Sequence, residues 1–122
     1  MARTVLQPGP QHPITVAPAP SRVTVQAGGT PVADTTAALA LQEAGYPTVY
    51  YVPLADVRAD VLKPSDHTTY CPYKGDASYY SLVTADGELA DVVWYYPEPY
   101  PAVAEIAGHV AFYADKVDIT AA

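Results

Sequence analysis

Short stretches in which apolar and polar residues alternate dominate the chain, and a period of two is typical of β-strands with one buried face. The clearest pair, residues 77–84 and 88–96, flanks Ala85-Asp86-Gly87, and an Asp-Gly pair between alternating runs predicts a tight hairpin. A second hairpin is predicted within residues 22–34, around Gly28-Gly29. The pattern therefore indicates short antiparallel strands.

The remaining segments add strands and little helix. Residues 35–43 favour a strand because Ala37, Leu39 and Leu41 alternate, although their composition also suits a helix. Short helical turns are predicted where Pro53 and Pro101 stand at a first helical position. Further strands or extended stretches are predicted at residues 48–52, 68–70, 110–113 and 116–120, with Leu62–Ser65 as a connection. With seven to nine strands and two stubs of helix, the chain is predicted to be mainly β.

The first twenty residues differ from the rest because they hold five prolines, which remove backbone donors and force extended conformations. We expect residues 1–20 to form a proline-rich N-terminal arm and residues 21–122 to form one domain. A chain of 122 residues is enough for one domain and too short for two ordinary ones.

The charge balance excludes some partners. Thirteen Asp and Glu against six Lys and Arg give a net charge of −7, which would repel nucleic acid and anionic bilayers. No apolar run reaches membrane-spanning length and the start lacks a signal-peptide pattern, so a cytoplasmic protein is expected. The single cysteine, Cys71, cannot form an internal disulfide or a multi-thiolate zinc site. We therefore expect no metal and no cofactor.

Eleven tyrosines accompany only one Phe and one Trp, which is an unusual balance for a generic core. Adjacent tyrosines on a strand point to opposite faces, so many of them can serve as cross-strand pairs that stabilise a sheet. Trp94 and Tyr96 share one face of their strand, with Tyr95 on the other. If Tyr51 or Tyr79 faces them, these rings would wall a slot for a small planar or cationic ligand.

The segment Cys71-Pro72-Tyr73-Lys74-Gly75 must bend and carries the reactive side chains. A Cys71 thiolate would be nucleophilic, and Lys74 in an apolar pocket could bind an anion or act as a base or imine-forming amine. The structural alternatives are a buried Cys71 packed under the turn and a salt bridge from Lys74 to Asp56, Asp66 or Asp76. His67 is a candidate for proton transfer, but on an extended strand it lies far from Cys71.

Several motifs resemble the domain-of-unknown-function family 427. They are Tyr51-Val52-Pro53, His67-Thr68-Thr69, the CPYKG segment, Trp94-Tyr95-Tyr96 and Gly108-His109-Val110-Ala111-Phe112-Tyr113, together with N-terminal pieces such as His12-Pro13-Ile14-Thr15 and Glu43-Ala44-Gly45-Tyr46-Pro47. Many members have His before the cysteine, where this chain has Tyr70.

The resemblance implies a β-tent fold, in which two antiparallel sheets meet at an angle, with one or two short helices. It covers nearly the whole chain. Relatives of this shape often hold a structural zinc with two Cys-x-x-Cys pairs, which one cysteine cannot provide.

These observations predict a small-molecule-binding domain with an aromatic pocket at the CPYKG turn and the strand at residues 94–96. The first alternative is a small-metabolite enzyme that uses Lys74 or Cys71 in the same pocket, with His67 or a tyrosine for proton transfer. The second is a homodimeric interaction module, since tyrosine favours interfaces. The predicted ligand-binding residues are Tyr51, Thr69, Tyr73, Lys74, Tyr79, Trp94 and Tyr96.

Overall fold

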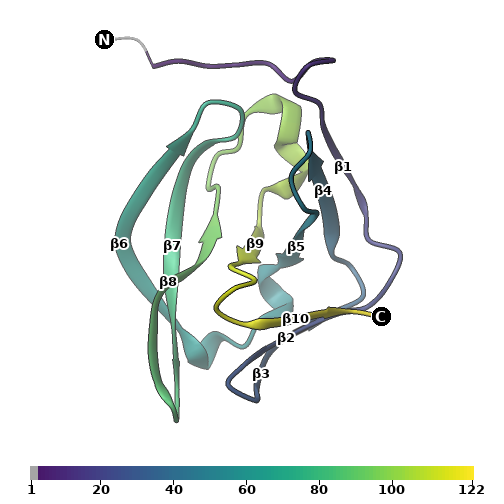
Figure 1. Cartoon of the computed structure of the whole chain (residues 1–122). Helices are drawn as coiled ribbons and strands as arrows, with labels where there is room; N and C mark the ends of the chain where they lie inside the picture. Colours follow the sequence, from purple (N-terminus) through teal and green to yellow (C-terminus); the bar gives the residue numbers. More distant parts are fainter. Residues whose placement is uncertain (1–2) are drawn as a thin grey trace.

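Residues 3–122, which the computed structural model describes, form ten β-strands and three short 3-10 helices (Figure 1). The strands are β1 (Ile14–Pro18), β2 (Val23–Ala27), β3 (Thr30–Thr35), β4 (Leu39–Glu43), β5 (Val49–Pro53), β6 (Leu62–Cys71), β7 (Gly75–Thr84), β8 (Gly87–Tyr95), β9 (His109–Phe112) and β10 (Asp118–Ala121). The helices are η1 (Leu54–Asp56), η2 (Ala59–Val61) and η3 (Pro101–Ile106). The mainly β prediction is confirmed.

The strands form two antiparallel sheets. One has seven strands in the order β1-β4-β5-β9-β8-β7-β6, and the other has three in the order β10-β2-β3. In Figure 1 the three-stranded sheet lies across one end of the larger one. Both predicted hairpins are present, as the pairs β2–β3 and β7–β8. The prediction of two antiparallel sheets with few short helices is confirmed.

Pairing in the seven-stranded sheet is short on both sides of β9. β9 pairs with β5 through Val110–Val52 and His109–Pro53 and with β8 through two further residue pairs, whereas β6–β7 and β7–β8 pair over longer stretches. We call β1-β4-β5 the first half of this sheet and β9-β8-β7-β6 the second half. The halves stand on opposite sides of the molecule in Figure 1, so one face of the sheet is enclosed between them.

The two faces of this sheet pack differently. Valines dominate one face, including Val52, Val93 and Val110, and this face packs with valines of β2 and β3. The enclosed face packs against η3 through Val103 and Ile106, both fully buried. On this face lie the inner cluster residues Leu41, Tyr51, Ala77, Tyr79, Tyr96 and Ala111. Aromatic side chains are therefore concentrated on the enclosed face.

The N-terminal segment lies along the turn between β6 and β7. The Arg3 guanidinium pairs with the Asp76 carboxylate and covers the Tyr70 ring at 3.8 Å, and the Leu6 N–H donates to the Pro72 carbonyl. β1 then pairs with β4. Residues 3–18 thus contact the rest of the chain, while a domain boundary at residue 20 stays a prediction.

The structure contains more strand residues than the sequence analysis predicted. β6 begins at Leu62, where a connection was predicted, and runs through Pro64. An edge strand tolerates proline because one row of its backbone groups needs no partner, and β6 is the last strand of its sheet. A bulge between Pro64 and Thr68 also interrupts the pairing there. In residues 35–43 the strand prediction holds from Leu39 onward.

Across the described residues, no helix has the length and hydrophobicity needed to cross a bilayer.

Candidate functional site

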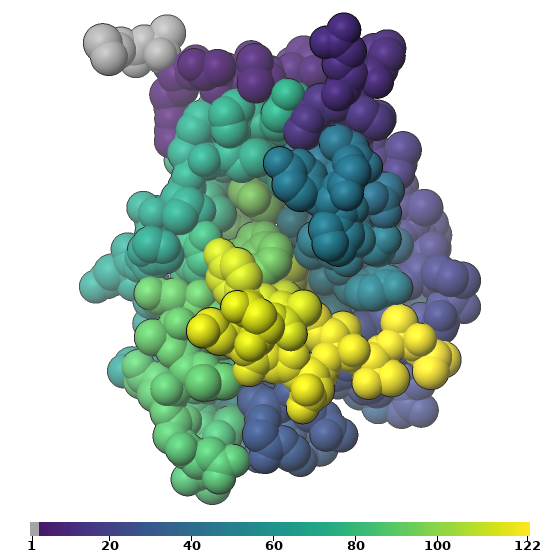
Figure 2. Space-filling model, in the orientation of Figure 1, coloured from purple at the N-terminus to yellow at the C-terminus, as the bar shows by residue number. Residues whose placement is uncertain are grey.

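A cavity of about 650 Å³ opens between the two halves of the seven-stranded sheet. Figure 2 shows its mouth as a hollow between the β4–β5 loop, the β6–β7 hairpin and the yellow C-terminal segment. Nine of the thirteen Phe, Trp and Tyr residues of the chain line it, so its walls are aromatic. These nine are Tyr46, Tyr50, Tyr51, Tyr73, Tyr79, Trp94, Tyr96, Phe112 and Tyr113.

The strand register sets the positions of these rings. Tyr79 on β7 lies opposite Trp94 on β8, so the two side chains share the enclosed face. The Trp94 indole N–H donates to the Tyr51 hydroxyl at 3.4 Å, across from the first half of the sheet. Tyr95 points to the other face and stacks on Tyr80. Trp94 therefore lies beside both Tyr51 and Tyr79, while the use of these rings as a ligand slot stays a prediction.

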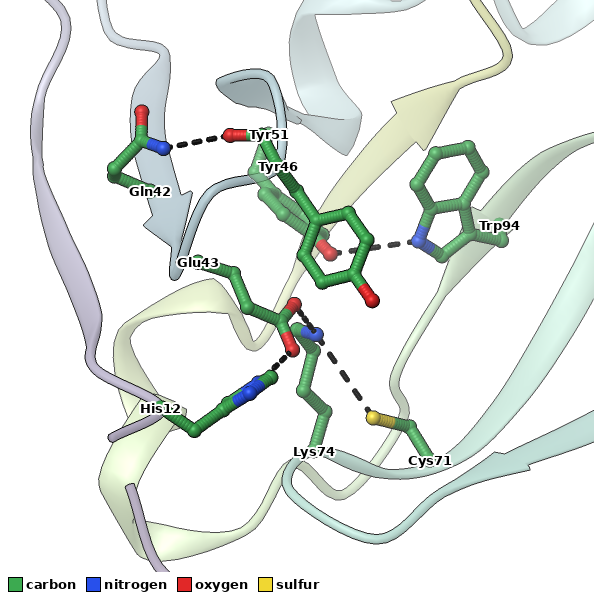
Figure 3. A network of polar contacts seen from close by, with 8 residues as sticks. All are labelled: His12, Gln42, Glu43, Tyr46, Tyr51, Cys71, Lys74 and Trp94. Carbon is green, nitrogen blue, oxygen red and sulfur yellow. Dashed lines mark hydrogen bonds and ion pairs between the residues drawn. The ribbon is translucent and has the colours of Figure 1, made fainter. Parts of the chain in front are cut away.

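A buried ionic group forms part of the cavity wall. Lys74, which is only 7% exposed, pairs with Glu43, and the His12 Nε2 lies 2.7 Å from the other Glu43 oxygen (Figure 3). Burial acts to raise the pKa of Glu43. The hydrogen bonds and positive charges of Lys74 and His12 outweigh it, so that this pKa lies below its ordinary value. Glu43 is therefore ionised at neutral pH.

The aspartates predicted as partners of Lys74 were the wrong residues. Asp76 pairs with Arg3, and Asp56 accepts from the Thr35 hydroxyl. The reason is the register of the β6–β7 turn, which places Asp76 opposite Tyr70 on the outer face and directs Lys74 toward the end of β4.

Cys71 lies beside this ionic group. Its Sγ is 3.8 Å from the Lys74 Nζ, and the thiol is half-buried in the cavity wall. The three-residue spacing from Cys71 to Lys74 brings them together because both flank one tight turn, in which the Lys74 N–H donates to the Cys71 carbonyl. The thiol and the ammonium therefore lie close together, which the sequence alone left open.

Two buried phenols, Tyr51 and Tyr96, also line the cavity. Burial raises the pKa of Tyr51 to about 12, although the Trp94 hydrogen bond opposes this shift. Burial also strongly raises the pKa of Tyr96, and the charges of Tyr51, Cys71 and Glu43 add to it. Among residues 3–122 the Tyr96 hydroxyl has no hydrogen-bond partner. Both hydroxyls are therefore held neutral at physiological pH.

The other predicted residues are more peripheral. The Thr69 hydroxyl bonds the Tyr79 hydroxyl at 2.9 Å but does not line the cavity. His67 is exposed and packs its ring on Tyr79 with centroids 4.6 Å apart. His109 bonds the Ala107 carbonyl instead. Neither the His67 ring nor the His109 ring therefore lies next to Cys71.

The turn that carries Lys74 is held in place by its backbone. Gly75 has φ +111°, and a Cβ there would lie 3.3 Å from the Glu98 carbonyl oxygen. The Tyr100 N–H donates to the Lys74 carbonyl at 2.9 Å. Glycine at position 75 therefore allows both the unusual torsion and the close approach of residues 98–100.

Sequence reasoning gave no role to two residues of the ionic group, His12 and Glu43. His12 stacks on Tyr73 with centroids 4.2 Å apart and planes 8° from parallel. Both residues belong to motifs quoted for the family resemblance, which was the available signal. Their role was hidden because the pairing depends on the N-terminal segment packing against the turn.

Across residues 3–122, no group of three or more His, Cys, Asp or Glu side chains could hold a metal ion.

The fold and the cavity define a mainly β domain with an aromatic interior and one buried ion pair. The family described as a domain of unknown function, DUF427, matches residues 15–122, and the chain belongs to this family. No curated protein matches the chain. His12 lies just before the matched region.

Proposed function

We propose that this protein binds a small organic molecule in the aromatic cavity. The proposal rests on one observation: nine aromatic rings line a cavity of about 650 Å³, a volume within the range of ligand pockets. Rings that only stabilised a core would pack against each other to native density. Here Tyr51, Tyr79, Trp94 and Tyr96 instead share a common hollow.

Polar groups at one end support this proposal. Ligand sites are mostly apolar with a few convergent polar groups that fix orientation, and Lys74, Cys71 and the Tyr96 hydroxyl fit that description. The net charge of −7 favours a small molecule over nucleic acid as the partner.

The test uses Trp94, the sole tryptophan, because its indole N–H gives a single signal in a nitrogen-edited NMR spectrum. We expect bicyclic aromatic compounds to shift this signal and to raise the melting temperature of the protein. The matched control is Tyr80→Phe, on the opposite face of the sheet, which should bind like the parent. If no aromatic probe moves the Trp94 signal at millimolar concentration, the proposal is wrong.

An enzymatic use of the same pocket rests on Lys74 and Cys71. The supporting observation is the 3.8 Å between Nζ and Sγ, since an ammonium beside a thiol favours the thiolate. The opposing observation is that Glu43 already pairs with Lys74. The rate at which iodoacetamide modifies Cys71, compared with the rate for a model thiol, tests this alternative. The homodimeric module stays a prediction that sedimentation equilibrium tests directly.

A further inference from the structure

Several hydrogen-bond donors of the cavity lining have no acceptor among the described residues. The Tyr96 hydroxyl meets no acceptor in residues 3–122. The Tyr51 oxygen accepts from Trp94, but its own O–H has no acceptor there. No fully buried side-chain nitrogen or oxygen of the described residues lacks a partner, so the Tyr96 hydroxyl is open to the cavity, where a ligand can accept from it.

Lys74 adds a third donor. An ammonium group has three N–H bonds, and Glu43 and Cys71 account for two of them. Lys74 is buried and lines the same cavity as the two phenols. The cavity lining therefore offers three donors.

The acceptors there are already engaged. One Glu43 oxygen accepts from Lys74 and the other from His12 (Figure 3). A ligand that offers only donors would therefore have to compete with an existing buried ion pair. A ligand that offers acceptors would complete the hydrogen bonding of Tyr51, Tyr96 and Lys74.

Charge restricts the ligand further. The charges of Glu43 and Lys74 cancel within the pair, and His12, which also contacts Glu43, carries a charge only when it is protonated. An anionic ligand would bring a second negative charge next to Glu43, and a cationic ligand would face Lys74. An uncompensated charge between apolar walls is strongly unfavourable.

Resting on the proposed function, we infer that the ligand is an uncharged planar ring compound with a carbonyl acceptor, which the Tyr51 and Tyr96 hydroxyls and Lys74 of the cavity lining bind. The ring lies among the aromatic side chains, and the carbonyl oxygen accepts from the phenols.

The experiment compares four probes of one shape. They are 2-naphthamide, which is neutral with an acceptor, 2-naphthoate, 2-naphthylmethylammonium and 2-methylnaphthalene. Binding is measured from the Trp94 indole signal at pH 7.5 with the full chain. We expect 2-naphthamide to bind at least about tenfold more tightly than each of the other three.

Two variants show which hydroxyl groups donate to the ligand. Tyr96→Phe keeps the ring and should weaken the binding of 2-naphthamide by roughly 3- to 10-fold, while the affinity for 2-methylnaphthalene stays unchanged. Tyr80→Phe, outside the cavity, should change neither. Tyr51→Phe provides a second test of the same donors if Tyr96→Phe fails to fold.

The outcomes distinguish the two proposals. If 2-naphthoate or the ammonium probe binds most tightly, or if neither phenol variant weakens 2-naphthamide, the inference is overturned while ring binding in the cavity stands. If none of the four probes shifts the Trp94 signal, the proposed function is overturned and the inference with it.

Discussion

Lys74 on the β6–β7 turn and Glu43 at the end of β4 form a buried ion pair although 31 residues separate them in sequence. β4 belongs to the first half of the seven-stranded sheet and β6–β7 to the second half. Within the described residues the strands of the two halves pair at β5–β9, so the side-chain ion pair adds a second connection between them.

Removal of the lysine charge should destabilise the protein strongly. In Lys74→Met, Glu43 keeps only His12 as a partner, and breaking a buried pair costs about 3 kcal/mol in free energy of unfolding. Urea denaturation measures this loss. The matched control is Lys63→Met, whose exposed pair with Glu88 is worth less than about 1 kcal/mol. Equal losses in the two variants would contradict a special role for the buried pair.

The contribution of Glu43 should depend on pH with a defined sign. Its pKa in the folded protein lies below the ordinary value of 4.5, so the stabilisation is fully present above that value. The stabilisation is lost as the pH falls through the folded-state pKa. We expect the difference in unfolding free energy between the parent and Glu43→Gln to be constant at pH 6–7.5 and to shrink below pH 4.5. If the difference in unfolding free energy stayed constant down to pH 3, the ionised Glu43 would not be the source of the stabilisation.

A side chain at position 75 should distort the CPYKG turn. Gly75→Val places a branched residue at φ +111° and against the Glu98 carbonyl, so we expect a loss of more than about 2 kcal/mol in unfolding free energy. Gly45→Val is the control, because a Cβ at position 45 meets nothing within 4 Å. A melting curve for Gly75→Val that matches the parent would refute the role of this turn.

Cys71 should report on occupancy of the cavity. It is the sole thiol and it lines the wall beside Lys74, so a bound ligand should shield it. We expect saturating 2-naphthamide to slow modification by iodoacetamide at least about fivefold, by the mass action of a ligand that excludes the reagent. Urea-unfolded protein, in which the ligand should have no effect on the rate, is the control. Unchanged rates in the folded protein would place the ligand away from Cys71.

Much of the fold could be predicted because its signals are local. The Asp86-Gly87 turn and the alternating runs beside it defined the β7–β8 hairpin, and Gly28-Gly29 defined β2–β3. The start of β6 was missed because Pro64 reads as a strand breaker until the strand is known to be an edge. Edge position is a property of the complete sheet and has no local signal.

The candidate site likewise has features with a local sequence signal and features without one. The shared face of Trp94 and Tyr96 follows from strand periodicity, and the proximity of Cys71 and Lys74 follows from one tight turn. Glu43 and His12 escaped prediction because their positions depend on the pairing of β1 with β4 and on the N-terminal segment crossing the turn. Long-range pairing of this kind leaves no periodic trace in the sequence.

The short pairings on both sides of β9 have a mechanical consequence. β9 is joined to β5 and to β8 through two residue pairs each, whereas β6–β7 and β7–β8 pair over longer stretches, so we expect bending of the large sheet to concentrate at β9. A small rotation there would change the width of the aromatic cavity and leave the β6–β7 and β7–β8 hairpins intact. The side-chain pair of Lys74 with Glu43, which spans from β6–β7 to β4, would limit such a rotation.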